Sequence, residues 1–119
     1  MDTLKNLLTS EFEKGNYVVA GGDWNQSPPG YKSPRPGVTA IVEMNVPDVY
    51  PAEGWQWAFD NTIPTNRKLN EIYTEAQTGI DILDFFLVSP NMEIVNVKSE
   101  DLGFKSSDHQ PVNMTVRLR

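Results

Sequence analysis

Cysteine is absent from the 119 residues of this chain, and histidine occurs only once. The first absence excludes disulfides, thiolate nucleophiles and zinc sites built on sulfur. Basic residues are also few: the chain has 10 lysines and arginines and 16 aspartates and glutamates, so its net charge is -6. Such a charge repels polyanions, so nucleic acid is a disfavoured partner and a small phosphorylated substrate suits the chain better.

A long apolar run is missing too, since no stretch approaches the roughly 18 residues of a membrane-spanning helix. Charged residues interrupt the amino-terminal segment, which predicts an amphipathic helix rather than a signal peptide; they are Lys5, Glu11, Glu13 and Lys14. The apolar stripe expected to lie on a sheet recurs at helical spacing and consists of Leu4, Leu7, Leu8 and Phe12. The compartment stays open, as cytoplasmic or as exported if a leader was removed.

The length fits a single domain, residues 1–119, with several predicted strands. Tyr17–Ala20 is apolar on both faces, which predicts a strand covered on both sides and ended by Gly21-Gly22. Ile80–Val88 gives the strongest strand signal and is also apolar on both faces. Trp55–Phe59 is expected to form a further strand.

The carboxy-terminal quarter predicts two more strands. Glu93–Lys98 alternates as a half-exposed strand, and the turn signal at Pro90-Asn91 predicts that it forms a hairpin with Ile80–Val88. Val112–Leu118 alternates apolar and polar residues, which predicts a final strand with one wet face.

Three segments between these elements favour loops. Gln26–Gly37 contains four prolines and two glycines, which predicts a surface loop. Asn61–Thr78 is polar and is expected to form a long connection with one helical turn near Leu69–Tyr73. Val38–Val46 stays open between a short helix and an edge strand.

Two acidic positions stand out against this framework. Asp84 lies between Ile82 and Phe86 on one face of a predicted strand, where an ionised carboxylate costs several kcal/mol unless it is paired or hydrogen-bonded. Asp23 and Asn25 follow a predicted buried strand and a glycine pair, at the kind of strand end where α/β sheets bind ligands. The alternatives are a strand-end carboxylate that reaches solvent and a simple polar turn.

The only histidine belongs to a third acidic segment. Asp108 and His109 stand before Gln110-Pro111, at the entry to the last predicted strand. An imidazole flanked by acid is a candidate proton-transfer group, although a solvated surface histidine has the same pattern. We expect His109 to donate a hydrogen bond to Asp84, at the end of the sheet where Asp23 also lies.

In this order the three segments resemble the carboxy-terminal half of the endonuclease/exonuclease/phosphatase superfamily, the pancreatic-deoxyribonuclease-like fold. The family's Gly-Asp-x-Asn motif maps onto Gly22–Asn25, its Ile-Asp-aromatic strand onto Leu83–Phe85, and its Ser-Asp-His-x-Pro-Val motif onto Ser107–Val112. The resemblance implies an α+β fold: half of a two-sheet sandwich with flanking helices, with one mixed, mostly antiparallel sheet in this chain. It also implies a metal-dependent phosphoester hydrolase, that is, a phosphodiesterase, phosphatase or nuclease that directs an in-line water attack.

The same resemblance implies a role for each site residue. Asp23 would orient or deprotonate the attacking water, and Asn25 would hydrogen-bond that water or a phosphate oxygen. His109 would stabilise negative charge on the phosphoryl oxygens while Asp84 holds its ring. Asp108 would lie near a Mg or Mn ion, which prefers oxygen ligands.

The family's first half, which supplies an asparagine and the principal glutamate ligand of the metal, has no counterpart in these residues. We therefore expect completion by the rest of a longer chain, by a second chain or by a second copy in a homodimer. A partner would also cover the face of Ile80–Val88 that the amino-terminal helix leaves bare. Two alternatives to an enzyme are a truncated, non-catalytic phosphate- or protein-binding domain and a structural domain whose acidic segments are solvated turns.

Overall fold

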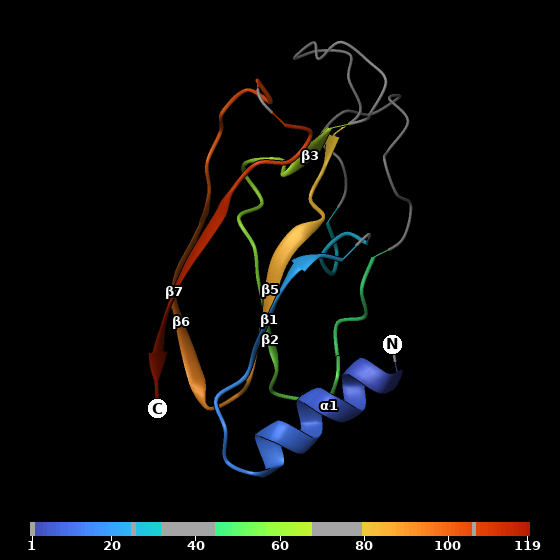
Figure 1. Cartoon of the computed structure of the whole chain (residues 1–119), viewed down its shortest axis with the longest axis vertical. Coiled ribbons are helices and arrows are strands. Elements are labelled where there is room, and N and C mark those ends of the chain that lie inside the picture. The colour runs from blue at the N-terminus through green and yellow to red at the C-terminus, as the bar shows by residue number, and fades with distance from the viewer. Residues whose placement is uncertain (1, 25, 32–44, 68–79, 106) are drawn as a thin grey trace.

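The computed structural model describes residues 2–24, 26–31, 45–67, 80–105 and 107–119. Within these residues one helix and seven strands follow one another, which is an α+β composition (Figure 1). Their bounds are α1 Asp2–Glu13, β1 Val19–Asp23, β2 Gln56–Ala58, β3 Asn66–Arg67, β4 Ile80–Asp81, β5 Asp84–Val88, β6 Met92–Ser99 and β7 Val112–Leu118. In Figure 1, α1 and β3 lie at opposite ends of the long axis.

The named strands form three antiparallel sheets rather than the single sheet that was expected. The first has the order β1-β5-β2, the second pairs β3 with β4, and the third pairs β6 with β7. Because β5 is the middle strand of the first sheet, its backbone is paired on both sides.

The apolar run Ile80–Val88 is divided between two of these sheets. Its first two residues form β4 and its last five form β5, with Ile82 and Leu83 between them. The backbone N–H of Leu83 donates to Thr65 Oγ1 at 2.9 Å and its carbonyl accepts from Trp24 N at 2.8 Å. The run therefore changes partners at Ile82 and Leu83, whose own side chains are buried.

The predicted hairpin between this run and Glu93–Lys98 is wrong. Both edges of β5 are occupied by β1 and β2, so β6 has no edge of β5 to join. After the turn that follows Ser89, β6 pairs with β7 instead, from Met92 opposite Leu118 to Ser99 opposite Val112.

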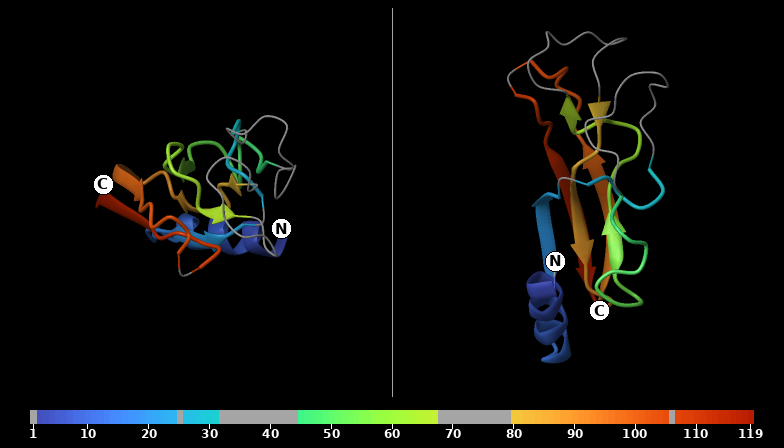
Figure 2. Two further views of the ribbon diagram at one scale, coloured as in Figure 1. Left: turned by 90° about the horizontal axis from the view of Figure 1, so that it is seen from above. Right: turned by 90° about the vertical axis from the view of Figure 1, so that its right-hand side faces the viewer.

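Helix α1 forms where the apolar spacing predicts it and covers one end of the first sheet (Figures 1 and 2). Leu8 is buried in a cluster with Tyr50, Trp55 and Leu87, and Leu4 and Phe12 pack against that cluster. Leu7, which was expected in the same stripe, is instead 57 % exposed. It lies about 100° around the helix from Leu8 and so falls outside the stripe that runs through every fourth residue.

Both faces of β5 are covered within this chain, which corrects the expectation of a bare face. Leu87 packs against α1 and Trp55 on one side. On the other side Val88 is fully buried with Ala58 and Met92. The partly buried residues packed against that second cluster come mainly from the β6–β7 sheet; they are Phe86, Ile94, Val97, Met114 and Val116.

The first strand differs from its prediction in both extent and burial. It continues through Gly21 and Gly22 to Asp23 instead of ending at the glycines. Val19 is 45 % exposed, because β1 is an edge strand with one wet face. Gly21 lies opposite Phe86, and a Cβ added there would stand 2.5 Å from the Phe86 ring.

The remaining predictions divide between confirmed elements and segments outside the described residues. β7 alternates as predicted, and β2 lies inside Trp55–Phe59. Residues 32–44 and 68–79, which include the predicted turn near Leu69–Tyr73 and most of Val38–Val46, lie outside the described residues. Within the part of the chain that the structure describes, no helix has the length and apolar character needed to cross a membrane.

Candidate functional site

Two carboxylates face each other at the end of the first sheet. Asp23 ends β1 and Asp84 begins β5, and the register pairs these two residues directly. Side chains of directly paired residues lie on the same face of the sheet, where like charges destabilise it. A positive or proton-donating group beside them therefore relieves a repulsion that the register creates.

The segment that carries His109 reaches this end through β3. The backbones of Asn66 and His109 form an antiparallel bridge, and Gln110 N donates to Thr65 O at 2.7 Å. The buried amide of Gln110 also donates to Pro64 O at 2.7 Å. These bonds place the His109 side chain at the mouth between the two carboxylates.

The imidazole of His109 contacts three carboxylates. Its Nδ1 lies 2.8 Å from Asp84 Oδ2, while its Nε2 lies 3.9 Å from Asp23 Oδ2 and 3.8 Å from Asp108 Oδ2. Because an ionised carboxylate only accepts, Nδ1 carries the proton and donates to Asp84. The expected contact between His109 and Asp84 is confirmed, and Asp23 lies at the same mouth.

These neighbours change the affinity of the ring for protons. Partial burial alone would lower the pKa of His109, but the hydrogen bond with Asp84 and the charges of Asp84, Asp108 and Asp23 outweigh it and raise the pKa. The side chain of His109 is still 37 % exposed, so part of the ring is accessible from solvent.

Two further residues of this site were missed by the sequence analysis. Thr65 and Asn66 are 0 % and 4 % exposed, and the amide of Asn66 lies within 3.1 Å of both ring nitrogens of His109. Their segment was predicted only as a polar connection. A threonine and an asparagine before a charged stretch carry no periodic signal, so only the backbone bridge with His109 identifies them.

Trp24 fixes the end of β1 beside the site. Its backbone N–H donates to Leu83 O and its ring Nε1 donates to Phe85 O at 2.9 Å. The indole also stacks on the Phe85 ring, with centroids 5.7 Å apart. Asp23 is therefore held by the residue that follows it, whereas Asn25 lies outside the described residues.

The same side chains include possible metal ligands. Asp23, Asp84 and His109 each offer one ligand atom, and these atoms lie within 4.8 Å of one another. Asp108, which was expected near the cation, adds a carboxylate beside Nε2. Magnesium takes oxygen ligands and is commonly held by one or two carboxylates with several waters, so the carboxylates of this group, without the imidazole, fit a hard divalent cation.

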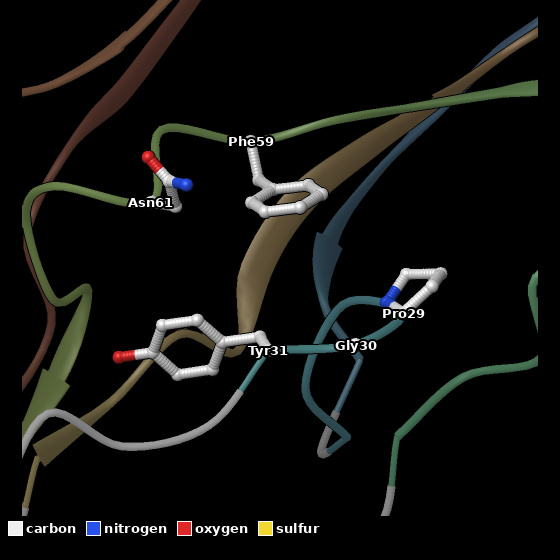
Figure 3. Close-up of a pocket in the computed structure, with 5 residues that line it drawn as sticks. All are labelled: Pro29, Gly30, Tyr31, Phe59 and Asn61. Carbon is white, nitrogen blue, oxygen red and sulfur yellow. The ribbon is translucent and has the colours of Figure 1, made fainter.

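A separate pocket of about 310 Å³ opens between the loop after β1 and the connection after β2 (Figure 3). Tyr31 and Phe59 supply aromatic walls, and the Asn61 amide supplies a polar edge; Pro29 and Gly30 complete the lining. None of these five residues belongs to the group around His109.

No protein-family model matches the chain, and no curated protein or solved structure is significantly similar to it. The physical basis for a function is therefore the geometry around His109.

Proposed function

We propose that the chain is a metal-dependent phosphoester hydrolase with the half-sandwich fold of the endonuclease/exonuclease/phosphatase superfamily. The observation that supports this most directly is the position of His109, whose ring lies between Asp84 on one side and Asp23 and Asp108 on the other. Three separate motifs supply these four side chains, and Asp84 and His109 are 25 residues apart along the chain.

In the proposed reaction, a water oxygen attacks phosphorus in line with the ester bond that breaks. Asp23 accepts the proton of that water, and the departing ester oxygen leaves with the bonding electron pair and takes a proton from solvent. His109 donates from Nε2 to a phosphoryl oxygen, where negative charge accumulates. Asp84 accepts from Nδ1 and so keeps the ring directed at the mouth.

A divalent cation is part of this proposal. Asp23 and Asp108 would hold it, because their carboxylates reach the solvent side of Nε2 and are not the direct partner of Nδ1. When bound, Mg or Mn would neutralise phosphoryl charge and polarise the phosphorus centre. It would also offset the net charge of -6, which otherwise disfavours an anionic substrate.

A second copy or a second chain is proposed to complete the ligand set. The family that the chain resembles takes its principal glutamate ligand from a half that these residues do not match. Light scattering over a range of concentrations tests the pairing of copies, because a chain that stays monomeric while it hydrolyses substrate would exclude a homodimer as the active form.

The hydrolase proposal is tested with bis-(p-nitrophenyl) phosphate in the presence of Mg or Mn. We expect metal-dependent release of nitrophenol that falls at least about 100-fold in His109→Ala, because the loss of one preorganised charge-stabilising group has that size. Asp48→Asn, which changes an exposed carboxylate of another loop, is the matched control and should keep full activity. Turnover that survives in His109→Ala would exclude the proposed site.

The alternative from another class is a non-catalytic domain that binds a phosphate group or a protein through the same mouth. The partly exposed imidazole of His109 favours this alternative, since a charged ring can bind a phosphate group without any chemistry. Calorimetric binding of a phosphorylated ligand without turnover, with or without the metal, would favour the binding domain over the hydrolase.

A further inference from the structure

Two aromatic side chains from separate segments line the pocket of Figure 3. Tyr31 comes from the loop after β1, and Phe59 comes from the connection after β2, which also supplies Asn61. Figure 3 shows the Tyr31 ring on one side of the pocket and the Phe59 ring and the Asn61 amide on the other. The volume of about 310 Å³ is at the lower end of the range for small-molecule sites, so the pocket suits one small group.

A turn of defined geometry positions Tyr31. Its backbone N–H donates to Pro28 O at 3.1 Å and closes a four-residue turn. Pro29 and Gly30 are the two central residues, and Gly30 has a φ of 72°, as a type II turn requires. The side chain of Asn45 donates from Nδ2 to Pro28 O at 2.6 Å and to Tyr31 O at 2.9 Å. A single amide therefore holds both ends of the turn.

Phe59 and Asn61 are also held from outside the pocket. Phe59 and Tyr31 both pack against the same buried cluster, and the ring of Phe59 meets that of Phe85 in this cluster edge-to-face, with centroids 6.4 Å apart. Asp60, which separates Phe59 from Asn61, accepts from the N–H of Ser99 on β6 at 3.1 Å. Because both sides of the pocket are positioned by these contacts, a ligand has little ordering left to impose.

The lining side chains define the chemistry of the group that fits. Aromatic rings bind another ring by offset stacking or by edge-to-face contact, and both Tyr31 and Phe59 are only half-buried. None of the five lining side chains carries a charge, and the net charge of -6 does not attract an anion. The amide of Asn61, at the exposed rim, can both donate and accept a hydrogen bond.

We infer that this pocket binds a neutral aromatic ring that carries a hydrogen-bonding group. The ring lies against Tyr31 and Phe59, and its polar group meets the amide of Asn61. The site is independent of the proposed hydrolase, because no lining residue belongs to the group around His109. Asn45 acts on this site through the turn that it holds and not through contact with the ligand.

Binding is tested on the whole chain with benzamide, a flat neutral ring that carries a carboxamide. Titration of the ¹⁵N-labelled protein should shift the backbone amide of Gly30 and the side-chain amide of Asn61, with a Kd on the order of 1 mM for a ligand of this size. Cyclohexanecarboxamide has the same polar group on a puckered ring without π electrons and should bind about 2- to 10-fold more weakly. Equal affinity for the two compounds, or shifts confined to other parts of the chain, would overturn the inference.

Matched substitutions then assign the binding to this pocket. Tyr31→Leu and Phe59→Leu keep an apolar side chain but remove a ring, and each should raise the Kd of benzamide about 2- to 10-fold. Phe12→Leu makes the same change in α1, where the ring packs edge-to-face on Trp55, and should leave the Kd unchanged. If Phe59→Leu fails to fold, Asn61→Ala at the exposed rim decides the question, since the loss of a hydrogen bond should raise the Kd by a similar factor. A Kd that is the same in all the pocket variants would contradict the assignment.

Two further variants separate the turn and the histidine site. Asn45→Asp replaces the donating NH₂ group by an oxygen that repels both carbonyls of the turn, so the Kd of benzamide should rise about 2- to 10-fold. An unchanged Kd in Asn45→Asp would exclude its role in positioning Tyr31. His109→Ala should bind benzamide as the wild type does, and weaker binding there would move the site to the group around His109. Hydrolysis is not part of this measurement, so the result does not depend on the hydrolase proposal.

Discussion

A proton on His109 is stabilised jointly by Asp84, Asp108 and Asp23, while partial burial of the ring opposes it. The hydrogen bond to Asp84 is the largest of the contributions that raise the pKa. Because this pKa is raised in the folded state, the resulting stability is fully present below the unfolded value of about 6.5. It is lost as the pH rises through the folded pKa.

We therefore predict that Asp84→Asn lowers the pKa of His109 and removes part of the stability seen at mildly acidic pH. The titration is measured by NMR of the single imidazole in the presence of EDTA, and stability by urea unfolding over the same pH range. Asp101→Asn, an exposed change that leaves the three carboxylates in place, serves as the control. A titration curve that is identical in Asp84→Asn and wild type would contradict the geometry of the pair.

Asp60, which lies away from the site, makes the folding stability depend on pH in the direction opposite to that of His109. Burial alone would raise the pKa of Asp60, but hydrogen bonds from the hydroxyl and N–H of Thr62 and from Ser99 N, together with the charge of Lys98, lower it. The stability that Asp60 contributes is therefore present above its unfolded pKa of about 3.9 and lost as the pH falls through the folded value.

The predicted consequence is that Asp60→Asn costs about 1.5–3 kcal/mol at pH 7, the usual value of hydrogen bonds to a charged group. The difference from wild type should shrink as the pH falls toward the folded pKa of Asp60. Urea midpoints at several pH values measure this, with Asp48→Asn as an exposed carboxylate control. A difference that stays constant across the acidic range would assign the effect to packing instead of charge.

At the scale of elements, the contact between Gly21 on β1 and Phe86 on β5 limits what β1 can contain. A methyl group at Gly21 would lie 2.5 Å from Phe86 Cδ1, so the ring or the strand must move. We predict that Gly21→Ala destabilises the fold by about 1–3 kcal/mol, as overpacking typically does. Chemical unfolding of Gly21→Ala, Phe86→Leu and the double variant measures it.

The double variant distinguishes crowding from the backbone freedom of glycine. If the ring is the obstacle, Phe86→Leu should recover part of the loss caused by Gly21→Ala, and the two changes should not be additive. Strict additivity would mean that the Phe86 ring does not restrict position 21.

Sequence periodicity predicted the elements whose burial is one-sided and local. The helical spacing of Leu4, Leu8 and Phe12 identified α1, and the alternation in Val112–Leu118 identified β7. Periodicity failed where pairing decides the outcome, because an apolar run records burial but not which strand lies beside it. For this reason the division of Ile80–Val88 and the partner of β6 required the structure.

Some residues of the candidate site could likewise be predicted from the sequence, and others could not. Asp84 was predicted as a site residue because it is a carboxylate between apolar neighbours, and its contact with His109 was expected from their motifs. Thr65 and Asn66 were not predicted, since their importance comes from a bridge between β3 and the segment before β7. Such long-range backbone pairing has no counterpart in a local sequence pattern.

For the whole molecule, the net charge of -6 and the gathering of Asp23, Asp84 and Asp108 at one end make cation binding measurable as stability. A cation that binds only the folded state at ten times its Kd contributes about 1.4 kcal/mol. For a domain of this size that corresponds to a rise of roughly 6 °C in Tm.

We predict this rise on addition of Mg, measured by differential scanning calorimetry against NaCl of equal ionic strength. Asp23→Asn and Asp108→Asn should each reduce it, whereas Asp48→Asn should not. Equal responses to both salts, or an undiminished response in the two site variants, would mean that general screening acts in place of a bound ion.

Side-chain hydroxyl groups accept backbone hydrogen bonds at both ends of β5. Thr65 Oγ1 receives the N–H of Asp84 where the strand begins, and Ser89 Oγ receives the N–H of Val18 just after it ends. With β1 and β2 on either side, the amide protons from Phe85 to Val88 should be the last in the protein to be replaced by deuterium. The backbone of the His109 segment pairs with β3 and its side chain meets Asp84 at the start of this slow-exchanging strand, so we expect the amide protons of that segment to exchange before those of β5.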